Sequence, residues 1–179
     1  MAISKITSIV AYTDMKGKYS LDINSDYTSR FDQMVIDNEY KVLTRMLGAS
    51  LYNTYRDNEL LTAWTDLLNG VENYTDYASI VRDWQGLKYL MVPHHYSEWI
   101  KINRYHSALT GLVLNDQENS TLLSASEVKR ISDNAFNEFL RRYNEAYIYL
   151  YTNLDTYTDF NLYFWNYSER GFILSKTVK

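Results

Sequence analysis

The clearest pattern of hydrophobic and polar positions lies in the last third of the chain. Apolar residues recur there at steps of three or four, at Val128, Ile131, Ala135, Phe139, Tyr143, Ala146 and Leu150. Charged and amide residues fill the other positions, so one face of a helix of about six turns is apolar. Ser124 and Glu127 have the spacing of a capping box, in which each side chain bonds the backbone N–H of the other residue. The pattern predicts a helix from residue 124 to residue 151.

A second long helix is predicted from Asn73 to about residue 102. Asn73 would be its N-cap, and Asp76 would lie at the positive end of the helix dipole. Its apolar stripe would comprise Ile80, Trp84, Leu87, Met91, His95, Trp99 and Ile102. Pro93 falls inside this stripe, removes one N–H and clashes with the carbonyl four residues earlier. We therefore expect a kink or a break near residues 90–93.

The segment 108–121 separates these two helices. It is too long for a simple helical hairpin, and its Leu-Val-Leu run is too apolar for a solvated linker. We predict a long loop that could form a β-hairpin and that contacts a partner. The residues assigned to this contact are Leu112, Val113, Leu114, Glu118 and Asn119.

Three further helices precede this pair. The first is expected to begin at residues 24–26 and to end at Gly48, because glycine takes the left-handed conformation after a helix without steric cost. Its stripe would comprise Phe31, Met34, Val35, Tyr40, Leu43, Met46 and Leu47. Two shorter helices are expected at 51–57 and 59–69, and Gly70 would end the second. We expect Trp64, Trp84 and Trp99 to be core residues.

The two ends of the chain have no clear helical period. Residues 1–24 are predicted to form an irregular arm that could include a short strand. The segment after residue 155 is aromatic, and it either folds back over the helices or docks on another chain. Candidate contact residues in it are Tyr163, Phe164, Trp165, Tyr167 and Phe172. We predict a mainly α fold, with one helical domain over 1–155 and a C-terminal arm over 156–179.

Composition narrows the classes of function. Apolar residues make up 46% and charged residues 22% of the chain, as in globular proteins. No apolar run approaches the roughly 20 residues of a membrane-spanning helix, and we expect no secretory signal. The absence of cysteine excludes disulfides and thiolate metal sites. The net charge of −4 argues against tight binding of nucleic-acid phosphates, whereas 18 tyrosines favour protein–protein contacts.

Candidate chemistry is confined to one histidine-rich stretch. His95 and Glu98 are one helical turn apart, with His94 adjacent and His106 further on, so a shared metal ion is conceivable. A carboxylate-bridged two-metal site needs Glu-x-x-His on two helices and two further glutamates, whereas this chain has a single pair in the reversed order. We expect instead half-buried, hydrogen-bonded histidines beside a helix break, and no metal or cofactor. No phosphate-binding glycine loop or serine elbow is present, so we expect no enzyme.

The order of helix stops and apolar residues resembles a known family. The segment Tyr40-x-x-Leu43-x-x-Met46-Leu47-Gly48-x-x-Leu51-Tyr52 is similar to the signature of the small α-helical head–tail connector (adaptor) proteins of tailed bacteriophages. The same pattern is matched further along the chain by Thr110-Gly111, then Glu118-Asn119-Ser120, then a helix with Asn134 and an aromatic stretch. The resemblance covers about residues 25–155, and the variant is similar to that of crAss-like phages. The N-terminal arm and the aromatic tail match poorly.

The resemblance implies a virion structural protein made in the host cytoplasm. Such connectors form a homo-oligomeric ring, commonly of twelve copies, beneath the portal protein. They extend the DNA channel without sequence-specific binding and carry stopper or tail proteins. Two alternatives stay open: a standalone helical protein-binding module whose tail packs in cis, and a metal-dependent helical enzyme that uses His95 and Glu98.

Overall fold

The structure is a computed structural model that describes residues 9–15, 25–57, 62–106, 113–114, 121–122 and 124–160. Its elements are α1 (Tyr12–Met15), α2 (Ser25–Leu47), α3 (Ala49–Asp57), α4 (Thr62–Asn69), β1 (Val71–Thr75), β2 (Val81–Trp84), α5 (Gly86–His106), β3 (Val113–Leu114), β4 (Thr121–Leu122) and α6 (Ala125–Thr152). The predicted mainly α fold is confirmed. None of the described helices is long and apolar enough to cross a membrane.

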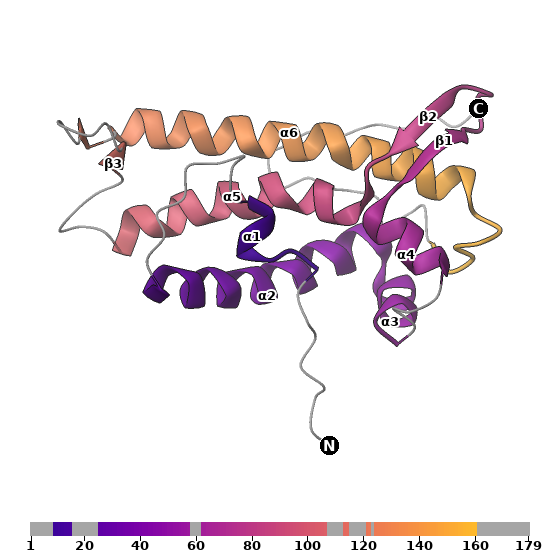
Figure 1. Cartoon of the computed structure of the whole chain (residues 1–179), viewed down its shortest axis with the longest axis horizontal. Coiled ribbons are helices and arrows are strands. Elements are labelled where there is room, and N and C mark those ends of the chain that lie inside the picture. The colour runs from indigo at the N-terminus through magenta and orange to yellow at the C-terminus, as the bar shows by residue number, and fades with distance from the viewer. Residues whose placement is uncertain are drawn as a thin grey trace, which may run out of the picture.

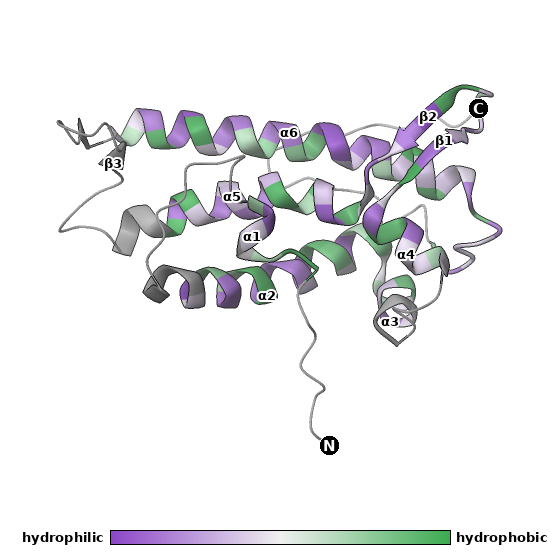
Figure 2. Cartoon of the chain, viewed as in Figure 1, coloured by the Kyte–Doolittle hydropathy of each residue, from purple (hydrophilic) through white to green (hydrophobic). Residues whose placement is uncertain are grey.

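Three long helices lie side by side along the molecule, with α5 between α2 and α6 (Figure 1). Helices α2 and α6 alternate hydrophobic and hydrophilic residues along their length, as expected for helices that bury one face, whereas the central helix α5 is buried on all sides over residues 90–95 (Figure 2). Phe31 of α2 meets Trp99 of α5 edge to face at 5.4 Å, and His94 of α5 meets Phe139 of α6 at 4.9 Å. The core therefore runs through both helix interfaces, with α5 at its centre.

Helix α6 confirms the sequence prediction closely. The backbone N–H of Glu127 donates to Oγ of Ser124, and the backbone N–H of Ser124 donates to Oε2 of Glu127, which completes the capping box. The predicted apolar stripe is buried except for Ile131, which is half-buried. The stripe packs against α5.

The predicted helix start at Asn73 is wrong. Residues 71–84 form an antiparallel hairpin, in which Thr75 pairs with Val81 and Val71 pairs with Trp84, and α5 begins only at Gly86. Asn73 has a φ of 55°, whereas an N-cap needs an extended backbone. Valine, threonine and aromatic residues favour strands, and here their cross-strand pairing prevails over the helical spacing.

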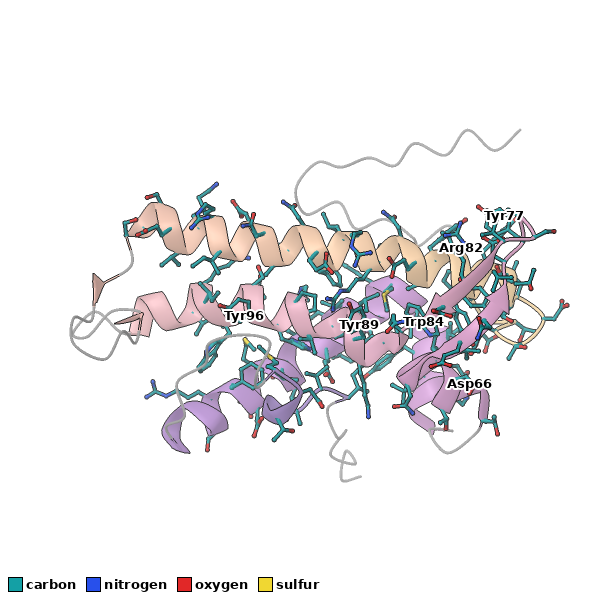
Figure 3. The ribbon with its side chains drawn as sticks, turned by 45° about the horizontal axis from the view of Figure 1, so that its top comes forward. Asp66, Tyr77, Arg82, Trp84, Tyr89 and Tyr96 are labelled. Atoms are coloured by element: carbon teal, nitrogen blue, oxygen red, sulfur yellow. The ribbon has the colours of Figure 1, made fainter. Side chains whose placement is uncertain are left out.

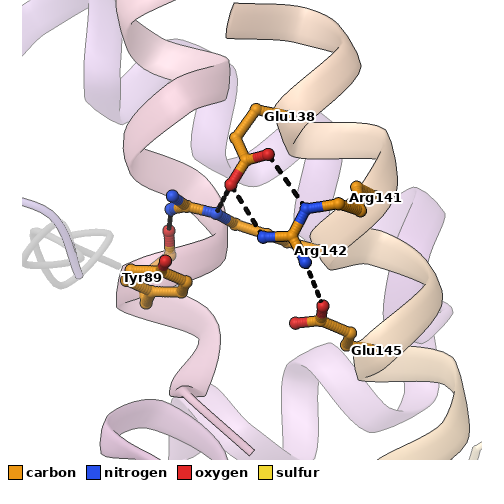
Figure 4. Close-up of polar contacts among 5 residues, drawn as sticks. All are labelled: Tyr89, Glu138, Arg141, Arg142 and Glu145. Atoms are coloured by element: carbon orange, nitrogen blue, oxygen red, sulfur yellow. Dashed lines mark hydrogen bonds and ion pairs between the residues drawn. The ribbon is translucent and has the colours of Figure 1, made fainter.

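Of the kink or break predicted near residues 90–93, the break is wrong, because α5 runs without interruption through Pro93. Pro93 leaves the carbonyl of Tyr89 without its helical N–H donor. Nη1 of Arg142, on α6, donates to this carbonyl instead (Figure 4). A side chain from the neighbouring helix thus satisfies the group that the proline exposes, and the helix can continue.

Arg142 belongs to an ion network on α6, and its contacts with Tyr89 join this network to α5 (Figure 4). Its guanidinium lies 3.5 Å from the centre of the Tyr89 ring, and its Nε donates to Oε1 of Glu138 over 2.8 Å. Arg141 donates to both oxygens of Glu138 and to Glu145. The hydrogen bond from Arg141, followed by that from Arg142, lowers the pKa of Glu138 to about 2.

The shorter helices follow the predictions with small shifts. Helix α2 ends before Gly48, whose φ is 81°, and α3 starts at Ala49 rather than at residue 51. Trp64, Trp84 and Trp99 are buried as predicted. Tyr40 was expected in the core but is 54% exposed, since Glu39 and Val42 occupy the inward positions.

Two irregular segments are described in part. Within the N-terminal arm, residues 12–15 form the one-turn helix α1 rather than a strand. In the loop after α5, Val113 pairs with Leu122 and Leu114 with Thr121, so the possible β-hairpin is confirmed. After α6 the chain folds back, and Tyr157 and Phe160 join the core. The hydroxyl of Tyr157 donates to the carbonyl of Ala63 over 2.7 Å.

Candidate functional site

The candidate functional site is the outer end of the β1–β2 hairpin. Tyr77, Ile80 and Val81 are 61%, 49% and 63% exposed, and we call these three residues the hairpin patch. Among the described residues, the other large apolar side chain exposed to this degree is Tyr40, on α2. Figure 3 shows Tyr77 and Arg82 at the outer end of the hairpin and Trp84 where it meets the helices. Clustered exposed apolar residues mark interaction sites more often than scattered ones.

The turn of the hairpin is built around the buried carboxylate of Asp76. Its Oδ1 accepts hydrogen bonds from the backbone N–H groups of Ala78, at 2.8 Å, and Ile80, at 2.9 Å. Its Oδ2 accepts from Nε of Arg82. The backbone of Asp76 also bonds to Ile80 and Ser79. One side chain therefore fixes the path of the segment that carries the hairpin patch.

These bonds also fix the charge of the turn. The hydrogen bond from Arg82, then that from the Ile80 backbone, lowers the pKa of Asp76 below its ordinary value of 3.8. The same contact with Asp76 raises the pKa of Arg82. Both side chains are therefore charged at neutral pH, and the aspartate is a better acceptor for the two backbone donors than a neutral acid would be.

Aromatic packing anchors the base of the hairpin. The Trp84 ring stacks on Tyr149 of α6 at 5.3 Å, and Nε1 of Trp84 donates to the carbonyl of Leu67 in α4. Tyr74 meets the same Tyr149 ring edge to face at 5.2 Å. Burial raises the pKa of Tyr74 to about 12, so its hydroxyl stays neutral. The hairpin is thus tied to both α4 and α6.

The outer part of the hairpin also contacts the end of α6. The backbone N–H of Tyr77 donates to Oγ1 of Thr152 over 3.2 Å. The Tyr77 ring meets Tyr151 edge to face at 5.0 Å, and Tyr151 stacks on Tyr147. Tyr77 is therefore held in place although most of its surface is open to solvent.

Two glycines allow the chain to enter and leave the hairpin at nearly the same point. Gly70 and Gly86 have φ values of 102° and 89°. A Cβ on Gly70 would lie 2.3 Å from the carbonyl oxygen of Trp84, and one on Gly86 would lie 2.3 Å from that of Leu68. Only glycine fits such a close approach of two backbones. The two glycines therefore let the start and the end of the hairpin lie close together where it joins α4 and α5.

The histidine-rich stretch does not form the expected site. His94 and His95 are buried rather than half-buried, and they lie in an unbroken helix. Nε2 of His95 is 3.5 Å from Oε1 of Glu39, while Glu98 pairs with Lys101. Burial lowers the pKa of His94 to about 3, so this ring is neutral. No group of three potential ligands among the described residues could hold a metal ion.

Glu39 has a different role at this position. Its two carboxylate oxygens accept the backbone N–H groups of Ile9, at 2.9 Å, and Val10, at 3.0 Å. Val10 and Met15, in the same part of the arm, are fully buried. A buried acid on α2 therefore holds residues 9 and 10 of the N-terminal arm against the helices.

The contact residues predicted from sequence are placed only in part. Val113 and Leu114 form β3, whereas Leu112, Glu118, Asn119 and the five aromatic residues of the tail lie outside the described ranges. The hairpin patch was missed. The signal available was a run rich in strand-forming residues, with Asp76 and Ser79 as turn residues, between Gly70 and Gly86.

Comparison with known proteins adds a family. A model for a family of unknown function, DUF6712, matches residues 43–163, a range that includes the hairpin, α5 and α6. No curated protein and no solved structure matches the chain. The match spans more than half of the sequence, and the chain belongs to the DUF6712 family.

Proposed function

We propose that this chain is a non-enzymatic structural subunit of a tailed-phage virion. Copies of it would form a ring that joins the portal to the tail and extends the DNA channel. The observation that carries the proposal is the hairpin patch, in which Tyr77, Ile80 and Val81 are exposed on a firmly held hairpin. A rigid apolar surface loses little conformational entropy when it binds, which favours stable assembly.

The resemblance to head–tail connectors also supports this proposal, because the residues that carry it form a junction between two helices. The motif from Tyr40 to Tyr52 forms the end of α2, the stop at Gly48 and the first turn of α3. Leu43, Met46 and Leu51 of this motif are buried. The motif therefore explains how two helices join, while the hairpin patch is the feature that suggests assembly.

The charge of the chain is compatible with a DNA channel. A net charge of −4 leaves little tendency to neutralise phosphates, so DNA could pass a ring of such subunits without being retained. Ring formation needs a head-to-tail interface made by two different surfaces of one chain. Candidate arms for reaching the portal or stopper proteins are the 109–122 loop and the segment after residue 160.

One observation favours a second candidate, a standalone helical binding module. The first part of the aromatic tail packs in cis, since Tyr157 and Phe160 are buried in the core of their own chain. A monomeric module needs its tail covered in this way. The two candidates differ in oligomeric state and in binding to a portal.

Negative-stain imaging of the purified protein, alone and mixed with the portal protein of the same genome, separates the candidates. A ring, or a portal with an added tier, is the expected result. Any truncation of the tail should begin after Phe160, because a cut at residue 155 would remove Tyr157 from the core. A monomer that leaves the portal unchanged would favour the standalone module and contradict the ring.

A further inference from the structure

We infer that the hairpin patch of one copy docks in a groove between α2 and α5 of a second copy. This α2–α5 groove has a volume of about 370 Å³ and is lined by Arg30, Met34, Asp37, Lys41, Trp99 and Ile102, among others. The inference rests on the proposed ring and names the interface that would build it. Both the hairpin patch and the groove that receives it are surfaces of this chain, so the partner is a second copy of the same protein.

The floor of the groove is apolar and its walls are polar. Met34, Trp99 and Ile102 come from two helices and form the floor. Met34 and Trp99 belong to the core and are only 7% and 4% exposed, whereas Ile102 is half-buried. The hairpin patch offers an aromatic ring and two β-branched side chains, which would lose their exposed surface there.

The hairpin is also suited to enter a groove. It is narrow, its turn is fixed by Asp76, and its base is anchored by Trp84. Val81 pairs with Thr75, whereas Arg82 pairs with Tyr74, the ring that packs on α6. Because neighbouring residues of a strand alternate between faces, Val81 lies on the face turned away from its own helices.

Charge favours the same pairing. The rim of the groove carries Arg30 and Lys41, both exposed, with Asp37 between them in sequence. The hairpin carries Glu72 and Asp83, also exposed, while its Arg82 is paired with Asp76. Among the described residues, no ion pair is formed by Glu72 or Asp83. A mainly basic rim would therefore meet a hairpin with two exposed acids, which improves both orientation and rate of association.

The two surfaces lie in different parts of an elongated molecule. The hairpin projects beside the end of α6, whereas the groove lies along α2 and the second half of α5 (Figure 1). Such a pairing joins two unlike surfaces, so each docked copy leaves one free hairpin and one free groove. Repetition closes into a ring when the rotation between copies permits it.

Cross-linking of the full chain tests the contact directly, because the protein contains no cysteine. We would prepare Val81→Cys and Gln33→Cys as separate proteins and confirm that each variant assembles like the wild type. The two variants would then be mixed and treated with a short bis-maleimide linker. Gln33 also lines the groove. The expected product is a covalent dimer of the two variants. The matched control replaces Gln33→Cys with Asn134→Cys, an exposed position on α6, and should give only background product.

Substitutions in the full chain give a second readout by sedimentation. Val81→Lys should weaken self-association by roughly tenfold or more, because it places a charge in the apolar contact. Tyr40→Lys changes an exposed ring outside the groove lining and should have no effect. Lys41→Glu and Glu72→Lys should each weaken association by roughly three- to tenfold, and the double variant should recover most of the loss.

The outcomes separate the docking from the ring. Three results together would overturn the docking while leaving the ring in place. The particle would have normal mass, cross-linking would be no better than in the Asn134→Cys control, and Val81→Lys would not change self-association. A chain that stays monomeric with and without the portal would overturn both. Specific cross-linking together with recovery in the double charge variant would support the docking.

Discussion

Arg142 donates a hydrogen bond to the backbone carbonyl of Tyr89, the group that Pro93 leaves without a helical donor. The same guanidinium lies over the Tyr89 ring and bonds to Glu138. One side chain of α6 therefore supplies the hydrogen bond that α5 lacks at Tyr89 and joins the two helices. This relationship explains why a proline at the centre of the core is compatible with a continuous helix.

Replacement of this arginine should be far more damaging than replacement of its neighbour. Arg142→Met removes a charged hydrogen-bond donor and a cation–π contact, and should lower the free energy of unfolding by roughly 2–4 kcal/mol. Arg141→Met, whose side chain is 56% exposed, should change it by less than about 1 kcal/mol. Urea unfolding measures both.

Pro93→Ala provides the internal control for this prediction. An alanine restores an N–H donor for the Tyr89 carbonyl, so Arg142→Met should be less destabilising in this background, by about 1 kcal/mol. Equal losses in the two backgrounds would show that the carbonyl does not depend on Arg142.

Acidification should weaken the same network. Arg141 and Arg142 lower the pKa of Glu138 from 4.5 to about 2 in the folded chain. The folded state binds this proton less tightly than the unfolded state, so the stabilisation is complete above about pH 4.5 and is lost as the pH falls toward 2. Glu138→Gln should show a flatter loss of unfolding free energy across this window. An identical slope in the variant and the parent would contradict the assignment.

Removal of the Asp76 carboxylate should release the hairpin turn without unfolding the helices. Asp76→Ala deprives the N–H groups of Ala78 and Ile80 of their acceptor, so hydrogen exchange at these amides should become faster, as expected for local opening. Asp83→Ala is the comparison, since Oδ1 of Asp83 accepts only the Asn73 N–H among the bonds observed for it. Unchanged exchange at Ala78 and Ile80 would mean that strand pairing alone holds the turn.

Glu39 should control the attachment of the N-terminal arm. Glu39→Gln keeps the shape of the side chain but replaces one acceptor oxygen by a donor, which cannot accept the N–H of Ile9 or Val10. Faster exchange at these two amides is expected, with α6 unaffected. Asp37→Asn, an exposed change on the same helix, should leave the arm protected.

Local signals were enough to predict much of the helical fold. The capping box of Ser124 and Glu127 and the stop at Gly48 act within a few residues, and both helix ends form as expected. The apolar stripe of α6 is read from spacing alone, and all of it but Ile131 is buried. Such features are predictable because their causes lie within one or two helical turns.

The candidate site was not predictable in the same way. Ile80, Trp84 and Leu87 have helical spacing, yet Trp84 stacks on Tyr149 and bonds to Leu67, contacts made by residues far away in sequence. Tyr40 and Glu39 are a second case in which helical spacing alone does not predict which side chain is buried. Spacing favours Tyr40 for the core, but Glu39 lies inward and bonds to Ile9 and Val10.

The mass of the particle formed by the full chain with its portal protein tests the central claim most directly. The ring proposal predicts a complex heavier than the portal by a whole multiple of 21.2 kDa, with a single dominant number of added copies. A portal of unchanged mass beside a 21.2 kDa monomer would contradict it.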